Sequence, residues 1–415
     1  MPSCPTFVRS PLVAAFAAAL LATAATAPAP LAAQERPDLP SLGNGARALG
    51  LGYAVTAVAD DLNAIGWNPA GLTAITSGEF ALTARLLVMG ASATVKDFNP
   101  DVYPQYGGEG EITGGLDPIE FVGLAFPFTI AGRRVVPAVA YRRLAEGIRP
   151  GEFETSQRLA NGRYFGSTTY KTTGGVRAIS PSIGIALHDR VRVGATANLL
   201  GGSSTYSIRG PYPYQYAMHE RDYEGLALDV GTLVTVRDGL TLGLYATLPH
   251  DRSFTFDNDT TVRAVTRAAP LALALGMALD LSRRDRLSAD IRHAPWSAAA
   301  FTDDASGDSV ASPLGVNDAS SLHIGLERDV TNDIRTSKVR LGLFARRTTA
   351  VDLKRKAISG LGVTGGQSWY FPSVRVDVGL AYRASSRWVR SEDSAFRLSL
   401  RNHDFALAVG LTRLF

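Results

Sequence analysis

The residues best suited to chemistry are charged side chains that recur in long alternating segments. Each lies on the side of its segment that carries glycine, alanine or polar residues, opposite the large apolar residues. A guanidinium such as Arg340 or Arg375 could bind a carboxylate ligand through charge-assisted hydrogen bonds. The same groups could instead neutralise one another across strands, as the spacing of Arg375 and Asp377 suggests. The set comprises Arg192, Asp229, Asp290, Arg292, Glu327, Lys338, Arg340, Arg375 and Asp377.

Catalytic chemistry finds little support. Of the six histidines, only His323 lies within an alternating segment, on the same face as Glu327. No GxSxG nucleophile motif and no paired-histidine metal spacing accompanies it. Cys4 is the only cysteine, and it falls in a segment expected to be removed. We therefore predict no enzyme, cofactor or metal site. His323, Arg340 and Arg375 remain candidate contacts for a ligand in the interior of the fold.

These side chains lie in segments where large apolar residues recur at every second position, and such segments must position them. In residues 271–281, leucine or methionine at every second position alternates with alanine, glycine and aspartate. Strict alternation places the two sets on opposite faces of a β-strand. Such segments run for about 9–12 residues, near the roughly 9–11 that a tilted strand needs to cross a bilayer. The large apolar residues are therefore predicted to face lipid and the others a lumen.

Glycine recurs on the predicted lumen face of segment after segment, which makes its placement part of the pattern. The positions are Gly184, Gly194, Gly231, Gly243, Gly276, Gly325, Gly342, Gly379 and Gly410.

The connections alternate between short and long, as in barrels with tight periplasmic turns and longer extracellular loops. Counting segments between them gives about twelve strands, the last ending near Tyr382, and a final pair at 388–400 and 405–415. The predicted fold is all-β, a transmembrane antiparallel β-barrel of about fourteen strands. The long connections are residues 96–115, 147–172, 207–222, 257–266, 297–317 and 350–368.

The N-terminal residues 1–33 have the order of a secretory signal peptide. Arg9 is their only charge, residues 12–25 are apolar, and small residues precede Gln34. We expect residues 1–33 to be a signal peptide, residues 34–78 to form a separate N-terminal segment, and residues 79–415 to form the barrel.

The C-terminal segment has the pattern of a strand that ends an outer-membrane barrel. Apolar residues alternate from Phe405 to Leu411, and the chain ends at Phe415. We expect the barrel assembly machinery to recognise Phe415 and the cell outer membrane to supply the surrounding lipid. The net charge of +4 comes from 42 basic and 38 acidic residues, a near balance that does not indicate nucleic acid binding.

Residues 34–78 do not read as a strand pair. Residues 43–52 are rich in glycine, and Tyr53 to Ile65 is rich in alanine and could form a short helix containing Asp60 and Asp61. Pro69 disfavours a helical conformation at Asn68, so a turn is expected there.

The run GARALGLGYAVTAVADDLNAIGWNPAGL resembles the N-terminal signature of FadL-type outer-membrane transporters of hydrophobic compounds, the OMPP1/FadL/TodX family. It is also similar to that of PorV/PorQ-type barrels. The resemblance implies a fourteen-stranded barrel whose N-terminal segment folds into the lumen as a hatch. The residues that match the hatch motif and its acidic pair are Asp60, Asp61, Asn68, Pro69, Ala70 and Gly71. They could act as a gate or only maintain the fold of the hatch.

The resemblance implies uptake of hydrophobic small molecules, such as long-chain fatty acids, by ligand-gated diffusion past the hatch. The glycines of residues 43–52 would supply its hinges. A PorV/PorQ-like barrel that binds secreted proteins in a secretion system is the alternative, and a general porin is a third reading.

Overall fold

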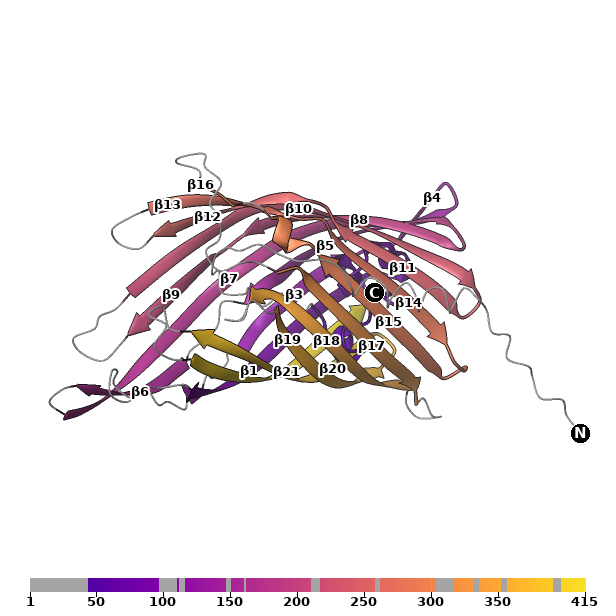
Figure 1. Ribbon diagram of the computed structural model, residues 1–415. Helices are drawn as coiled ribbons and strands as arrows, with labels where there is room; N and C mark the ends of the chain where they lie inside the picture. Colours follow the sequence, from indigo (N-terminus) through magenta and orange to yellow (C-terminus); the bar gives the residue numbers. More distant parts are fainter. Residues whose placement is uncertain are drawn as a thin grey trace, which may run out of the picture. The chain divides into compact units, whose positions relative to one another are not determined.

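The computed structural model (Figure 1) describes most of residues 44–415, which belong to one compact unit that begins at residue 31. The predicted signal peptide, residues 1–33, lies outside the described residues. The described ranges are 44–96, 110–111, 116–146, 151–159, 162–209, 217–257, 262–299, 301–303, 317–330, 336–351, 357–390 and 397–415.

A closed antiparallel β-barrel of 14 strands forms the wall, as predicted. Each strand pairs with the next in sequence, and the last pairs with the first. The wall strands are β1 (Glu79–Lys96), β3 (Leu116–Ala125), β5 (Arg133–Glu146), β7 (Gly162–His188), β8 (Val191–Gly201), β10 (Ala217–Arg237), β11 (Leu240–Thr247), β14 (Ala272–Asp280), β15 (Asp285–Ala294), β17 (Ala319–Asp329), β18 (Thr336–Val351), β19 (Ala357–Tyr370), β20 (Val374–Arg390) and β21 (Arg397–Leu414).

Shorter strands extend this wall. Most prolong it at the end opposite the short turns, where for example β12 pairs with β10 and β13 with β12, whereas β4 opens the short hairpin into β5. The shorter strands are β2 (Gly110–Glu111), β4 (Phe128–Ile130), β6 (Gly151–Leu159), β9 (Ser203–Arg209), β12 (His250–Asp257), β13 (Val262–Ala269) and β16 (Phe301–Asp303).

Helical structure is sparse in the described part of the chain. The elements are the α-helix α2 (Ala46–Gly50) and the 3₁₀ helices η1 (Leu62–Gly66), η2 (Pro69–Ala74) and η3 (Trp296–Ala298). Among the described residues, none of these helices is long and apolar enough to cross a membrane.

The barrel closes between the first and last wall strands. Their register runs without interruption from Glu79 opposite Leu414 to Lys96 opposite Arg397. The amide of the terminal Phe415 donates a hydrogen bond of 2.9 Å to the carbonyl of Gly78. The C-terminal pattern is therefore that of the closing strand.

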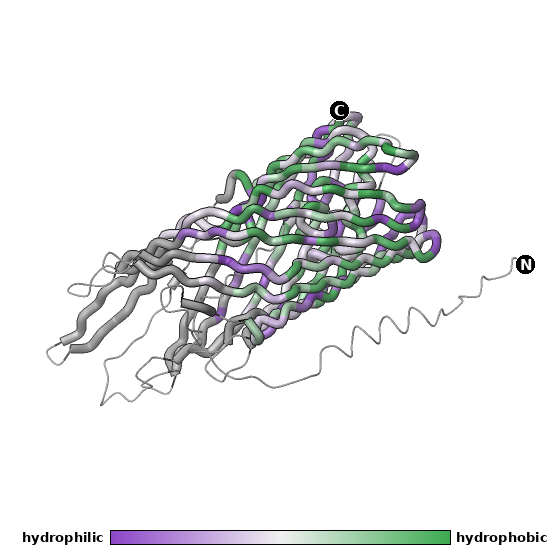
Figure 2. The backbone as a smooth tube through the Cα atoms, turned by 90° about the horizontal axis from the view of Figure 1, so that it is seen from above, coloured by the Kyte–Doolittle hydropathy of each residue, from purple (hydrophilic) through white to green (hydrophobic). Residues whose placement is uncertain are grey.

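The alternation of side chains separates an apolar exterior from a lumen, and Figure 2 shows hydrophobic residues along the described strands and hydrophilic ones at many of the short turns. In β14, Leu273 and Leu275 are 42% and 43% exposed, whereas Ala274 and Ala278 are 2% and 5% exposed. The buried apolar core lies inside the barrel and consists largely of residues 46–75. The predicted faces are thus confirmed.

Several predicted boundaries are wrong. The expected loop at residues 350–368 contains most of β19, and the expected strand at 388–400 is divided between the end of β20 and the start of β21. The expected loop at 147–172 likewise contains β6 and the first part of β7. Glycines at 360, 362, 365 and 366 gave β19 the composition of a loop, although Gly366 admits the close approach of Gly50 on the lumen face.

The exterior pattern makes a depth-dependent prediction. Leu275→Arg is expected to lower the free energy of unfolding in lipid vesicles by about 2–4 kcal/mol, because a cation near the middle of the hydrocarbon is costly. Leu281→Arg, after the end of the same strand, should cost about 0–1 kcal/mol. Urea titration followed by tryptophan fluorescence measures both, and equal costs would contradict a membrane-facing β14.

Candidate functional site

Residues 44–78, here called the lumenal segment, run through the interior of the barrel. Residues 44–75 are buried except for Asp60, Gly66 and Ala74. Side chains and backbone of this segment bond to wall strands on different sides of the barrel, including β10, β15, β17 and β20. The segment therefore occupies the lumen at the level of these strands.

The first part of the lumenal segment folds differently from the sequence prediction. The α-helix lies at Ala46–Gly50, and within residues 53–65 the only helical structure is the start of the 3₁₀ helix η1 at Leu62. Gly52 and Tyr53 have φ values of 62° and 66°, which end the helix. Asp60 and Asp61 thus precede η1 instead of lying in a helix. The reason is that the amides of Val55 and Thr56 bond to Asp290 and the backbone at Thr56 and Ala57 packs against Gly243 of the wall, which local helix propensity does not encode.

The predicted turn at Asn68 is present. Asn68 is extended, with φ −166° and ψ 99°, and its side chain accepts a hydrogen bond of 3.2 Å from the amide of Ala70 to cap η2. Its amide nitrogen donates to the carbonyls of Thr56 at 2.9 Å and Thr232 at 3.1 Å. Asn68 therefore joins two turns of the lumenal segment to β10.

Pro69, Ala70 and Gly71 follow, and they lie close to the backbone of Ala59 in the segment and of Gly194 in the wall. A Cβ on Gly71 would overlap the carbonyl of Ala59, and one on Gly194 of the wall would overlap the backbone of Pro69 and Ala70. The four motif residues 68–71 thus fix how the segment folds on itself and on β8 and β10.

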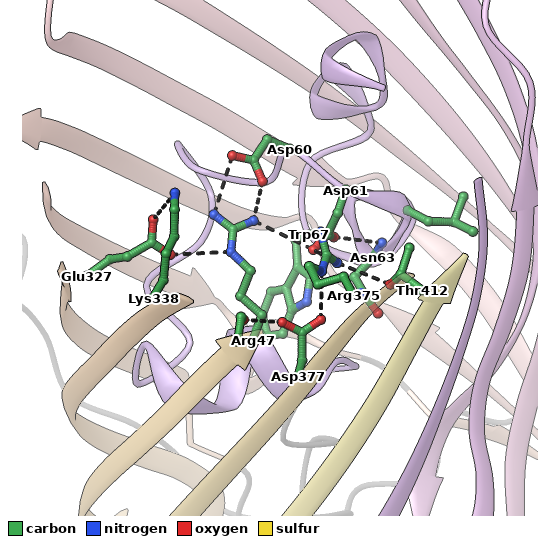
Figure 3. Close-up of polar contacts among 12 residues, drawn as sticks. Arg47, Asp60, Asp61, Asn63, Trp67, Glu327, Lys338, Arg375, Asp377 and Thr412 are labelled. Atoms are coloured by element: carbon green, nitrogen blue, oxygen red, sulfur yellow. Dashed lines mark hydrogen bonds and ion pairs between the residues drawn. The ribbon is translucent and has the colours of Figure 1, made fainter. Parts of the chain in front are cut away.

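The acidic pair divides its contacts between the segment and the wall (Figure 3). Asp60 forms an ion pair with Arg47 of α2. Asp61 caps η1 through the amide of Asn63 at 3.0 Å and also accepts a hydrogen bond of 2.9 Å from Arg375 on β20. Asp61 therefore ties the segment to the wall, whereas the more exposed Asp60 acts within the segment.

Arg47 is the centre of this ionic network. It lies 3.6 Å from both Asp61 and Glu327 in addition to pairing with Asp60. Burial acts to lower the pKa of Arg47, but the negative charges of Asp60, Glu327 and Asp61 raise it well above its ordinary value. Arg47 is therefore a permanent cation held between segment and wall.

The wall completes the network with residues that the sequence singled out. Arg340 donates to Glu327 at 2.7 Å and also bonds to Ser368, which in turn bonds to Asp377. Arg375 donates to Asp377 at 2.8 Å, so the pairing of these two residues is confirmed. Arg340 and Arg375 thus already have protein partners.

His323 belongs to a different part of the lumen. Its Nδ1 lies 2.7 Å from the carbonyl of Gly52, and its ring is 6.0 Å from that of Phe344 and 6.2 Å from that of Tyr53. Tyr53 also packs against Trp67 at 5.9 Å. The structure therefore places His323 in an aromatic cluster around the segment, apart from Arg340 and Arg375.

Asp290 on β15 accepts hydrogen bonds from the backbone of the segment. One carboxylate oxygen accepts hydrogen bonds from the amides of Val55 at 2.9 Å and Thr56 at 2.8 Å, and from the Thr56 hydroxyl at 2.7 Å. Arg292 donates to the same oxygen at 3.1 Å and its guanidinium lies 4.4 Å from the centre of the Trp67 ring. Polar wall residues thus satisfy backbone groups that the short helices leave unpaired.

The recurring glycines form a belt at the level of the segment, here called the glycine belt. In several of these glycines a Cβ would overlap the segment backbone: Gly243 meets the carbonyl of Thr56, Gly325 that of Leu51, and Gly379 that of Ala46. Glycine is required here because the two backbones touch. Eight of the nine recurring glycines belong to the belt; Gly410 does not, because a Cβ there would make only ordinary contacts, and Gly366 joins the belt instead. The belt comprises Gly184, Gly194, Gly231, Gly243, Gly276, Gly325, Gly342, Gly366 and Gly379.

Three residues of the site, Arg47, Thr56 and Tyr53, were not predicted from the sequence. Arg47 was detectable, because it is the only charged residue between Asp38 and Asp60. Thr56 and Tyr53 act mainly through contacts with residues more than 200 positions away, such as Asp290 and His323, for which no local signal exists.

No protein-family model matches the sequence, and no curated protein matches it. A FadL homologue from Pseudomonas aeruginosa matches 90% of this chain over 98% of its own, with a TM-score of 0.61 and 13% identity. The chain has the FadL-type transporter fold.

Two toluene transporters share this FadL-type fold. TodX from Pseudomonas putida covers 90% of this chain over 99% of its own at TM-score 0.61 and 16% identity. TbuX from Ralstonia pickettii covers 90% over 98% at TM-score 0.58 and 14% identity. With its apolar exterior, the FadL-type barrel described here is a multi-pass protein of the outer membrane.

The glycine belt predicts that a single methyl group displaces the segment. Gly342→Ala puts a Cβ into the backbone of Leu51 and Gly52, whereas at Gly365 the nearest atoms would be 3.8 Å away. We expect Gly342→Ala to raise ion conductance in planar bilayers and Gly365→Ala to leave it unchanged. Both should retain the heat-modifiable mobility of a folded barrel. Equal conductance of the two variants would contradict the role of the belt.

The ionic network predicts that Arg47 holds the segment closed. Arg47→Gln should cost about 3 kcal/mol, because it leaves buried carboxylates with fewer partners. With a reporter at buried Val58→Cys, thiol labelling should accelerate about 100-fold. The matched control is Lys338→Gln, which also removes a cation from Glu327 but from a half-exposed site. If both variants label at the parental rate, Arg47 does not hold the segment.

Proposed function

We propose that this FadL-type barrel admits hydrophobic small molecules across the outer membrane by ligand-gated diffusion past the lumenal segment, with long-chain fatty acids among its substrates. The main support is that residues 44–75 are almost continuously buried inside the wall. A barrel of this size otherwise leaves an aqueous channel, and such a channel does not solvate an apolar molecule.

The segment has the features of a movable element. Gly45 and Gly52 flank α2 with φ values of 99° and 62°, and such positions absorb backbone rotation. The contacts between segment and wall at Arg375, Glu327 and Asp290 are polar. They can be exchanged for water or ligand groups, so the energy of ligand binding can drive opening.

The three candidate ligand contacts act as anchors of the segment in the closed state. Arg375 binds Asp61, His323 binds the carbonyl of Gly52, and Arg340 orients Glu327 towards Arg47. A ligand carboxylate that engages any of them must exchange with these partners. We propose that such exchange couples ligand binding to opening, and that residues 60–61 and 68–71 form the gate.

A disulfide lock tests the movement. A Cβ on Gly410 would lie 3.7 Å from that of Ala46, within the range of a disulfide. Ala46→Cys with Gly410→Cys should therefore fix α2 to β21 under oxidation, and Cys4 is the only other cysteine. Uptake of labelled oleate and labelled toluene by whole cells should fall to the level of cells lacking the protein and recover after reduction. The two single variants are the controls.

The outcomes separate the competing functions. Unchanged uptake of both compounds on deletion of the protein removes the transport function and favours a partner role in secretion. Uptake that depends on the protein but persists in the oxidised lock shows transport without movement of α2. High conductance that deletion of residues 44–78 does not raise would identify a general porin.

A further inference from the structure

A row of polar and basic residues crosses the outside of the barrel at the end opposite the short turns. His293 lies opposite Ser320, Ser320 opposite Arg347, and Arg347 opposite Ser359. Residues directly opposite one another in a sheet share a face. Arg347 is exposed between two serines, and the next strands continue the row to the exposed Arg401, whose register partner is Ser386.

The row borders the apolar exterior. One step closer to the short turns on the same strands, the outward residues include Leu322 and Leu361. Tyr382 also lies inside the row, and its hydroxyl is 2.6 Å from Nδ1 of the exposed His403. An aromatic ring with its polar atom directed away from the apolar surface is typical of a membrane interface.

The distance between the row and the opposite rim of the barrel matches the thickness of the hydrocarbon core of a bilayer. Arg401 and Arg413 are exposed on the same face of β21, twelve residues apart. At about 3.3 Å per residue and a tilt of about 40°, they are separated by about 30 Å along the membrane normal, which is the thickness of the hydrocarbon core. Arg401 thus lies at the level of the outer headgroups, and Arg413 at the level of the inner ones. Arg347 lies in the same row of residues as Arg401.

The charge of the row is not neutralised within the described part of the protein. Arg347 and Arg401 form no hydrogen bond or ion pair with another described residue. At the opposite rim, by contrast, Arg328 lies 3.5 Å from Asp285. Asp318, just beyond Ser320, accepts hydrogen bonds of 3.0 and 2.6 Å from the backbone and side chain of Ser297.

The geometry points to a binding site for phosphorylated lipid headgroups of the outer leaflet on the outside of β15, β17, β18, β19, β20 and β21. Arg347 would bind a phosphate through its two terminal nitrogens, with the hydroxyls of Ser320 and Ser359 on either side as further donors. Arg401 would bind a second phosphate, or the second group of a bisphosphorylated lipid. The acyl chains would lie along the leucines below. This site does not depend on what passes through the lumen.

Native mass spectrometry of the detergent-purified protein, titrated with bisphosphorylated lipid A, tests the site. Arg347→Gln with Arg401→Gln is expected to weaken binding by about 30-fold, from the usual contribution of a basic residue near an anionic membrane surface. The matched control is Arg328→Gln with Arg413→Gln, which removes two exposed arginines from the other rim and should leave the affinity unchanged.

Two further probes define the ligand. Lipid A without its phosphates should bind to the parent protein as weakly as bisphosphorylated lipid A binds to the Arg347→Gln, Arg401→Gln protein. A millimolar excess of inorganic phosphate should not displace the lipid, because the acyl chains contribute to binding. The proposal is overturned if the two double variants bind bisphosphorylated lipid A equally, if dephosphorylated lipid A binds the parent as well as the bisphosphorylated form, or if inorganic phosphate displaces it.

Discussion

The close approach of two backbones inside the barrel is the constraint on which the rest of the structure depends. A fourteen-stranded barrel has a lumen too wide for wall side chains alone to fill. Here a chain segment fills it, and its backbone lies directly against the wall backbone where the wall has glycine. Gly243 and Gly379 show this directly, since a Cβ on either would overlap a carbonyl of the segment. The glycine belt is therefore a seat for the segment.

The helices of this segment are short, so many of its backbone groups have no hydrogen-bond partner within a helix. The wall supplies the missing partners. Asp290 accepts from two successive amides, and the Asn68 side chain donates to carbonyls of both segment and wall. Buried charges are admitted on the same condition, that each finds an opposite charge, as Arg47 does with Asp60. Polar contacts hold the segment firmly but remain exchangeable with ligand or water, which suits a gate better than an apolar seal.

The alternation of side chains gives one strand two environments. On β18, Leu341 and Leu343 face outward, while Arg340 and Gly342 serve the ionic network and the belt. The same rule brings Arg347 to the outside, where the apolar surface ends. Residues that face the lumen and residues that face outward can thus change independently of one another on the same strands.

The sequence by itself determined the barrel, its strand number, its two faces and the turn at Asn68, because these follow from local periodicity and from the effect of Pro69. It also identified Arg340, Arg375 and Asp377 as lumen charges. It misplaced the helix and the boundaries near β19, where glycines resemble a loop. Only the tertiary structure decided that the glycine belt lies against a segment, that Arg47 joins Asp60 to Glu327, and that Asp290 binds Thr56. These contacts join residues far apart in sequence, and their geometry exists only once the barrel has closed around the segment.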